Sequence, residues 1–358
     1  MLLVFSMFLG WYLVSKVCQI RRVNYLGNKT SINFWIYSFG ILLFLSILCQ
    51  GLYTLAYGGY LGIIEYSSLI RSGLFEEIPG NKFSFLKPFA GISMIASYGF
   101  FGLIISQHTR KIIIIGFFAA FIFSLYLLYT WLGRMGFLLY LFTFIFGFVL
   151  SKTTSLIKLL TLGALCFVLC LFSAYAVSNI LSLKSSSSII SFIAREISFP
   201  FASFISQLEN NNHLDRFLID FIFTPIYLLP SSWWSSWFTQ VGEINTEVIM
   251  GAAKGVDGVT GAIPVDILTL GLMQGHFPGV IITGIIFGIL LRYLQFKVFS
   301  VNILGLRYML EAYLILKISL FSLFYAQPNM VIIGNFPLIA SVLLCSFFLF
   351  AKERVKFL

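Results

Sequence analysis

The chain has 358 residues, of which 59% are hydrophobic, 18% aromatic and only 10% charged, with a formal net charge of +10. Soluble globular domains carry about 25% charged and about 45–50% apolar residues, so this composition excludes a soluble globular protein. The mean hydropathy of +0.97 and the 41 Phe, many in unbroken apolar runs, predict an all-α polytopic membrane protein.

Apolar segments long enough to cross a membrane follow one another along the chain. A spanning helix needs about 20 mostly apolar residues. Nine segments fit this description: Met1–Gln19, Ser31–Tyr57, Phe89–Gln107, Ile112–Leu132, Met135–Leu150, Leu156–Leu181, Ile263–Leu291, Leu306–Ala326 and Val331–Phe350. The seventh contains Asp266 and Pro278, which predicts a half-helix or re-entrant piece followed by a true span. Counting broken segments separately gives nine to eleven transmembrane helices.

Basic residues indicate the orientation of these spans. Lys and Arg are retained on the cytoplasmic side, and here they cluster after spans one, three, five, seven and nine. We therefore expect the N-terminus outside and the C-terminus in the cytoplasm. The first segment has no basic residues before it and no small-residue cleavage site, so we expect a retained helix rather than a signal peptide. The net positive charge then reflects the orientation of the spans in the membrane. A nucleic-acid binder is not supported, because no surface rich in basic and aromatic residues is predicted outside the spans.

Three regions follow from this pattern. Residues 1–181 carry six spans and a short outer loop near 58–88, which we expect to form an interfacial helix. Residues 182–262 form one large outer segment, which is too apolar to be disordered and is expected to be a helical cap. Residues 263–358 carry the remaining spans.

The outer segment contains two clusters that suggest binding. A helix over His213–Asp220 is expected to place His213, Arg216 and Asp220 on one face. The Arg–Asp pair either stabilises a surface helix by about 0.3–0.5 kcal/mol or belongs to a binding site. A tryptophan cluster fits either the membrane–water interface or a platform for sugar rings: Trp233, Trp234 and Trp237.

Charged residues within apolar runs are costly and indicate function by default, at about 2.5–3.5 kcal/mol each. Arg134 lies between two spans with almost no loop, so its side chain either reaches the head groups or binds a ligand. The neighbouring Gly133 and Gly136 allow close backbone approach and favour the ligand. Glu311 and Lys317 in span eight are interpreted as end-snorkelling residues or members of internal pairs.

Candidate proton acceptors lie on or near the outer side. Glu243 and Glu247 are four residues apart on a predicted helix, where like charges repel unless a cation is near, which favours a site. Asp266 begins an apolar helix and either complements the helix dipole or acts in a site. His276 lies at an outer-facing turn and is either a hydrogen-bonded turn residue or a functional one.

Several motifs are absent from the sequence. It contains no GxxxxGK[ST] loop, no GxGxxG after a strand, no HExxH, no Asp-x-Asp pair and no Ser nucleophile elbow. Its five Cys form no disulfide or zinc pattern. ATP-driven pumping, nucleotide-sugar transfer and zinc proteolysis are therefore poorly supported. An outer-face enzyme without nucleotides needs an activated donor such as a lipid pyrophosphate, whose oxygens suit arginine forks.

The chain resembles the bacterial O-antigen polymerases of the Wzy type. The resemblance covers the whole chain in architecture, as a small Phe-rich polytopic protein with a large outer loop late in the sequence. Two local patterns carry it: Gly133-Arg134-Met-Gly136 at the start of a span, and an acid before a Gly-rich helix from Gly258 to Arg292. It implies a fold similar to the C-type membrane glycosyltransferases, at the periplasmic face of the bacterial inner membrane.

The resemblance implies transfer of a growing glycan from undecaprenyl pyrophosphate to an incoming lipid-linked repeat unit. Arg134, Arg195 and Arg216, with His213, would bind the pyrophosphates and glycan. One of four groups would accept the proton of the attacking hydroxyl: Asp266, Glu243, Glu247 or His276. No metal or cofactor is required, and a protein that sets chain length is an expected partner. The alternatives are an O-antigen ligase with the same donor, or a lipid-linked oligosaccharide flippase or transporter.

Overall fold

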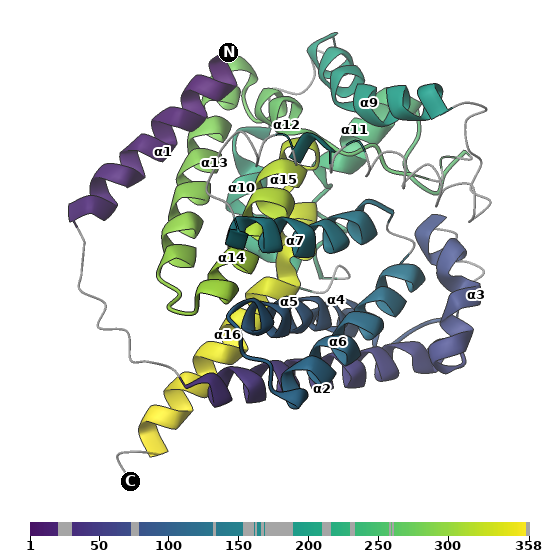
Figure 1. Ribbon diagram of the computed structural model, residues 1–358. Helices are drawn as coiled ribbons and strands as arrows, with labels where there is room; N and C mark the ends of the chain where they lie inside the picture. The colour runs from purple at the N-terminus through teal and green to yellow at the C-terminus, as the bar shows by residue number, and fades with distance from the viewer. Residues whose placement is uncertain are drawn as a thin grey trace.

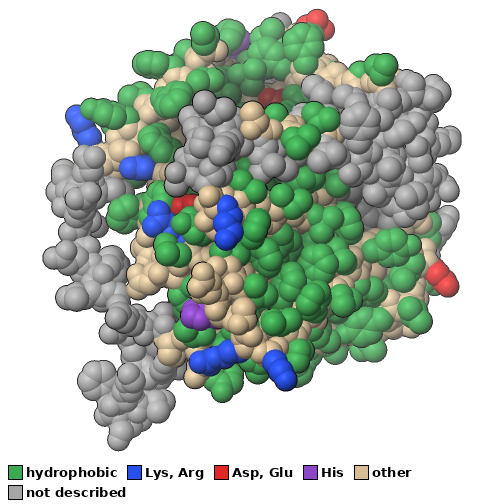
Figure 2. All heavy atoms as spheres, in the orientation of Figure 1, with side chains coloured by type: hydrophobic (Ala, Val, Ile, Leu, Met, Phe, Trp, Pro, Cys, Tyr) green, Lys and Arg blue, Asp and Glu red, His purple; other side chains and the backbone are tan. Residues whose placement is uncertain are grey.

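The computed structural model describes residues 1–355 except 21–30, 73–78, 132–133, 153–160, 162, 166–167, 169–188, 210–215, 230–232, 258 and 260. The described residues form helices and no strand (Figure 1). Six of these helices are long and apolar enough to cross a membrane. This agrees with the predicted class, an all-α polytopic membrane protein. Apolar side chains cover much of the described part of the face in Figure 2, and Lys and Arg gather toward its left side.

The helices along the first three predicted spans and the outer loop have the following bounds: α1 Leu2–Ile20, α2 Ile32–Thr54, α3 Gly59–Ser72, α4 Lys87–Ala90 and α5 Ile92–Ile105. The next helices precede or belong to the outer segment: α6 Lys111–Thr130, α7 Arg134–Lys152, α9 Ile189–Glu209, α10 Ile219–Ile222 and α11 Val241–Met250. The last group is α12 Ile267–Met273, α13 His276–Phe299, α14 Leu304–Tyr313, the π-helix η7 Leu314–Leu320, α15 Phe321–Phe324 and α16 Pro328–Val355.

The six candidate spans match five of the nine predicted segments and the second part of a sixth. They are Ile32–Tyr57, Ser84–Ile105, Lys111–Thr130, Met135–Lys152, His276–Phe299 and Pro328–Phe348. The first predicted span forms helix α1, with Leu2–Lys16 as its described apolar part, and the eighth is divided by the π-helix. Most of the sixth predicted span, Leu156–Leu181, lies outside the described residues.

The seventh predicted span is broken, as its sequence predicts. The short helix α12 ends at Met273, and α13 begins at His276 after a turn. Gly275 has φ of 146° and His276 has φ of 58°, so the backbone enters the region that favours glycine. Pro278 lies in the first turn of α13, where a missing backbone N–H is tolerated.

Helices α1 and α13 lie side by side along much of their length (Figure 1). A Cβ at Gly284 would collide with Ser6, and one at Gly288 would collide with the carbonyl of Met7. The glycines of α13 therefore allow the two backbones to approach closely, the packing role predicted for them.

Helix α5 lies at the centre of the bundle, against α2, α6, α7, α14 and α16. Ten of its 14 residues are buried. Among them, Tyr98 packs with Phe144 and Tyr140 of α7 and with Tyr313 of α14. This aromatic core forms one wall of the cavity described below.

Candidate functional site

Arg216 and Asp220 of the outer segment form a buried ion pair. Arg216 Nε and Nη2 donate to the two carboxylate oxygens of Asp220, each at 2.6 Å. The Asp220 side chain is 0% exposed and that of Arg216 is 15% exposed. Gln274 Nε2, two residues before His276, donates to Asp220 Oδ2 at 2.6 Å. Three hydrogen bonds therefore stabilise the carboxylate, and they join the outer segment to the turn between α12 and α13.

Two further contacts complete this group. Arg216 Nη2 donates to the carbonyl of Thr239 at 2.8 Å, and the guanidinium lies over the ring of Phe238 at 5.3 Å from its centroid. We call Arg216, Asp220, Gln274, Thr239 and Phe238 the outer network. Of the two roles considered for this pair from the sequence, a surface ion pair is wrong, because the Asp220 carboxylate has no solvent exposure.

The helix predicted over His213–Asp220 is also wrong in its described part. Leu218 has φ of 60°, which interrupts any helix, and α10 begins only at Ile219. The Arg216–Asp220 pair forms across this turn. His213 lies outside the described residues, as do the side chains of Arg134 and Arg195. Arg134 is the first residue of α7.

Glu243 lies near this network, on the predicted helix α11. Burial raises the pKa of Tyr227 well above its usual range. The negative charges of Asp220 and Glu243 raise this pKa further, whereas the positive charge of Arg216 lowers it. Arg216, Asp220 and Glu243 thus act on the same phenol. Glu247, one turn further along α11, is exposed to solvent.

Asp266 caps α12. Its Oδ1 accepts hydrogen bonds from the backbone N–H groups of Leu268 at 2.9 Å and Thr269 at 3.1 Å, and its Oδ2 accepts from the Thr269 hydroxyl. Burial raises the pKa of Asp266, while the bonds from Thr269 and Leu268 oppose that rise. The structure places this carboxylate in a structural role, with both oxygens occupied.

His276, at the other end of α12, is half-buried. Its ring packs edge-on against that of Phe277, with 4.8 Å between centroids. Its positive φ places it in a strained turn, which is typical of a position that serves either geometry or function.

A cavity that contains charged residues lies between the candidate spans. It has a volume of about 390 Å³ and is surrounded by α4, α5, α7, α16 and the π-helix. We call it the lysine chamber and define it by six of its lining residues: Lys87, Trp131, Lys317, Tyr98, Tyr140 and Tyr313. Gly136 also lines it, so the N-terminal turn of α7, which begins with Arg134, lies at its wall.

The two lysines of the chamber lack an acidic partner in the described structure. Arg216–Asp220 and Arg307–Glu311 are ion pairs between described residues, and neither involves Lys87 or Lys317. Lys317 lies on the π-helix, and its Nζ lies over the ring of Phe321 at 4.4 Å. Such π-helical turns occur frequently at functional sites. Glu311 pairs with Arg307, so it has one of the two roles considered for it, that of a pair member. Lys317 forms no such pair with a described residue.

Trp131 also lines the chamber. Its indole Nε1 is buried and has no hydrogen-bond partner among the described atoms. A buried unpaired donor costs about 1–3 kcal/mol. Among the described lining residues, the two lysines are the charged ones, so the lining carries positive charge, which suits an oxyanion.

An apolar groove adjoins the chamber. It has a volume of about 210 Å³, and its wall includes Trp35, Phe39, Leu306, Leu338 and Val342. The groove and the chamber share three residues: Ile95, Tyr98 and Tyr313. A ligand with an anionic head and a long apolar tail would find both environments side by side.

Helix α16 connects the chamber with the outer segment. Asn329 Nδ2 donates to Gln240 Oε1 at the start of α11, and Gln327 packs against Gly242. One turn later, Met330 and Ile333 line the chamber. The helix that carries Glu243 and Glu247 therefore rests on the first turn of a chamber wall.

Sequence reasoning missed Lys87 and Trp131. Lys87 looks like one more charge of an outer loop, and Trp131 like an interfacial residue, because their shared cavity depends on packing. Lys317 was noticed as a charge within a span. Among the described residues, no group of three or more His, Cys, Asp or Glu is placed to hold a metal ion.

No family model, curated protein or solved structure matches the chain.

Proposed function

We propose that this protein is an O-antigen polymerase, a membrane glycosyltransferase that joins undecaprenyl-pyrophosphate-linked repeat units into polysaccharide. The observation that carries the proposal is the lysine chamber next to the apolar groove. Lys87, Lys317 and the Trp131 N–H would bind the pyrophosphate, and the groove would accept part of the polyprenyl chain. The volume of about 390 Å³ greatly exceeds the roughly 30 Å³ share of one water molecule in the liquid.

The proposed reaction breaks the bond between the anomeric carbon of the growing glycan and its pyrophosphate oxygen. The same carbon forms a new bond to a hydroxyl oxygen of the incoming repeat unit, whose proton passes to a base. The leaving lipid pyrophosphate retains the electron pair, and the lysines stabilise its developing charge.

Among the candidate bases, Asp266 caps α12, whereas the side chains of Glu243, Glu247 and His276 make no hydrogen bond with another described residue. We propose a base among these three. Arg134, at the chamber wall, is our proposed additional phosphate ligand, and Arg195 and His213 remain candidates to bind the glycan. Arg216 has two nitrogens occupied by Asp220, so we assign it to the scaffold.

The proposal includes an arrangement in the membrane. The protein would lie in the bacterial inner membrane with nine to eleven helices, a fold similar to the C-type glycosyltransferases and an active site facing the periplasm. Its N-terminus would be periplasmic and its C-terminus cytoplasmic. A chain-length regulator is a proposed partner, and the reaction would need no metal or cofactor.

A gel of surface polysaccharide tests the function. A strain without this protein is complemented with wild type, Lys317→Gln or the matched control Lys297→Gln, an exposed lysine on α13. We expect a ladder with wild type and Lys297→Gln, and a single repeat on the lipid core with Lys317→Gln at equal protein levels. Full-length polymer retained on its carrier lipid would indicate a ligase. Absence of any repeat from the periplasm would indicate a flippase.

A further inference from the structure

Large apolar side chains are exposed on the outer segment, in two described stretches, 217–229 and 233–238. We call these two stretches the aromatic unit. Its outward side chains are between 47% and 72% exposed: Phe217, Ile222, Leu228, Leu229, Trp233 and Trp237. They surround one small core, described next, so they belong to one surface rather than to scattered positions. An exposed apolar surface of this kind marks a contact with a membrane or another molecule.

A small core holds the aromatic unit together. The side chains of Tyr227, Trp234 and Phe238 are buried against one another. Tyr227 packs edge-on against Trp234, with 5.2 Å between the ring centroids. Trp234 is thus part of the core, whereas Trp233 and Trp237 of the same cluster are directed outward.

The aromatic unit makes hydrogen bonds within itself. The Phe238 N–H donates to the carbonyl of Trp234 at 3.0 Å. The indole N–H of Trp234 donates to the carbonyl of Leu229 at 3.3 Å, and that of Trp237 to the carbonyl of Trp233 at 3.1 Å. A surface in contact with lipid has to satisfy its polar groups within the protein, and these bonds do so.

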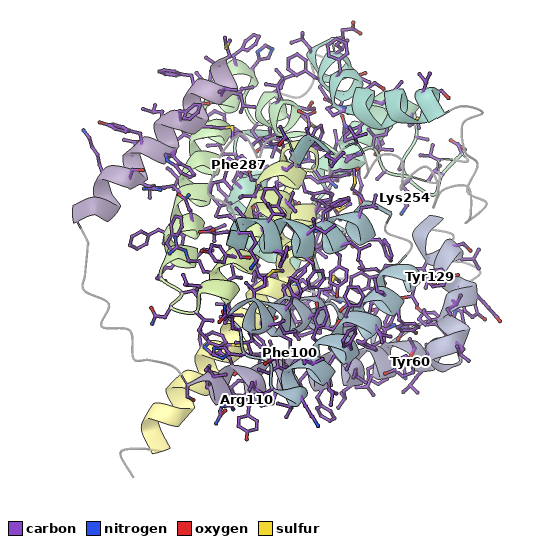
Figure 3. All side chains as sticks on the ribbon, viewed as in Figure 1. Tyr60, Phe100, Arg110, Tyr129, Lys254 and Phe287 are labelled. Carbon is purple, nitrogen blue, oxygen red and sulfur yellow. The ribbon has the colours of Figure 1, made fainter. Side chains whose placement is uncertain are left out.

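The aromatic unit also lacks charge. Residues 221–242 contain no Asp, Glu, Lys, Arg or His, whereas soluble domains carry about 25% charged residues. The loop after α11 differs, because Lys254 and Asp257 lie there close in sequence to the exposed Met250 and Val256. In Figure 3, Lys254 lies on the side of the molecule where Tyr129 of α6 and α3 also lie. The outer segment thus has one uncharged apolar surface and one charged loop.

The aromatic unit lies at the ends of two candidate spans. Ile332 packs against its core, and this residue lies in the first two turns of α16, a candidate span that begins at Pro328. Phe217 lies beside Gly275, where an added Cβ would be 3.8 Å from Phe217 Cδ2. Gly275 immediately precedes the candidate span that begins at His276. The unit therefore continues the apolar surface of α13 and α16 at the level where these helices enter a membrane.

A platform for a glycan is the alternative for the exposed rings. Ligand sites combine apolar surface with a few precisely placed polar groups. Gln240, which follows the unit, already accepts a hydrogen bond from Asn329, and residues 221–242 offer no charged group. The lack of charge and the position at two span ends favour lipid over a glycan.

We propose that the aromatic unit is an interfacial anchor, whose outward side chains insert into the lipid leaflet in which α13 and α16 begin. Trp233 and Trp237 would lie among the head groups, where amphipathic rings are enriched. The apolar side chains of Phe217, Ile222 and the Leu228–Leu229 pair would reach the adjoining part of the acyl chains. The anchor would fix the depth of the outer segment on the membrane, whichever reaction the protein performs.

Photolabelling in nanodiscs tests the anchor. The full-length protein is reconstituted with a phospholipid that carries a diazirine near the head-group end of one acyl chain, and adducts are mapped by mass spectrometry after irradiation. We expect adducts on Trp233 and Trp237 at yields comparable with those on Phe118, an exposed residue of the candidate span α6. Met250 and Val256, which are similarly exposed on the same outer segment, are the matched control and should remain at background.

Hydroxyl-radical oxidation of the same nanodiscs separates the alternatives. Lipid adducts on Trp233 and Trp237 with little oxidation would support the anchor. Oxidised rings without adducts would overturn it, because the rings would face water and be free to bind a glycan. Rings with neither modification would also overturn it, because another part of the protein would cover them. Adducts on Met250 and Val256 at the same yield would show that lipid contact is not confined to the unit, which again contradicts the anchor.

A variant of an exposed ring provides a second test. Trp233→Asp places a carboxylate on the surface while the core of Tyr227, Trp234 and Phe238 stays in place, so the thermal unfolding midpoint in detergent should be retained. We expect Trp237 to lose most of its lipid adducts, because a charge disfavours insertion. Val256→Asp, the control, should leave them unchanged. Unchanged adducts on Trp237 in folded Trp233→Asp protein would overturn the anchor, and neither result depends on polymerase activity, because no glycan substrate is present.

Discussion

The outer network and the lysine chamber use buried charge in opposite ways. In the outer network, Asp220 is fully buried and accepts three hydrogen bonds, two of them from Arg216. In the chamber, Lys87 and Lys317 have no ion-pair partner among the described residues, and the Trp131 N–H has no acceptor. In the first region the buried carboxylate has its counterion, whereas in the second no described residue supplies one.

This difference indicates which region is scaffold and which is site. A buried charge with all its partners fixes one geometry, and removing one partner leaves the other uncompensated. A cavity lined by cations without a described counterion costs stability in the free protein and gains it when a ligand supplies the negative charge. The four predictions below test this assignment, from the largest expected effect to the smallest.

Removing one partner of the outer network should give the largest loss of stability. Asp220→Ala leaves Arg216 buried and unpaired, and we expect a loss of about 3–5 kcal/mol, measured by thermal unfolding in detergent. The double variant Arg216→Met with Asp220→Leu should recover most of that stability. A double variant as unstable as Asp220→Ala would show that the network does more than satisfy its own charges.

Removing the chamber cation should act on activity instead. Lys317→Gln should lower the polymerisation rate about 100-fold, comparable with the loss of one transition-state donor, and leave the unfolding midpoint unchanged or higher. The reason is that no described residue around the chamber compensates the positive charge of the two lysines. Polymer formed by purified protein from lipid-linked repeat units measures the rate, with Lys297→Gln as control. A lower midpoint at unchanged rate would assign Lys317 to packing.

The indole N–H of Trp131 should contribute a smaller part of anion binding. Trp131→Phe keeps an aromatic ring but removes the donor, and we expect about tenfold weaker binding of a lipid pyrophosphate. The loss of the N–H itself should cost no stability, because the donor has no partner among the described atoms, so any loss reflects the smaller ring in a packed position. Trp131→Tyr offers a matched ring with a displaced donor. Wild-type affinity in Trp131→Phe would remove the indole from the site.

Asp266 provides the smallest and most local test. Asp266→Ala should cost about 1 kcal/mol, because α12 loses its cap, whereas Asp266→Asn retains a capping oxygen and most of that stability. If Asp266 only caps α12, the Asn variant remains active. A stable but inactive Asp266→Asn protein would make the carboxylate the base of the reaction.

Much of the fold could be predicted because membrane spans depend on composition alone. The break before His276 was expected because Asp266 and Pro278 lie in one apolar run. The helix over His213–Asp220 was wrong in its described part because Leu218 adopts a left-handed backbone, which side-chain spacing does not predict. Lys87 and Lys317 are 230 positions apart in sequence, and only the folding of α4 and the π-helix around one cavity brings both residues to it.

Binding of undecaprenyl pyrophosphate to the purified protein in nanodiscs tests the central claim most directly, with native mass spectrometry as the readout. We predict at least about tenfold weaker binding by Lys317→Gln, a loss of about 1.4 kcal/mol, and wild-type affinity for both Lys297→Gln and the Arg216→Met, Asp220→Leu double variant. Wild-type affinity in Lys317→Gln together with lost binding in the folded double variant would contradict the account, because the outer network would then be the site and the chamber the scaffold.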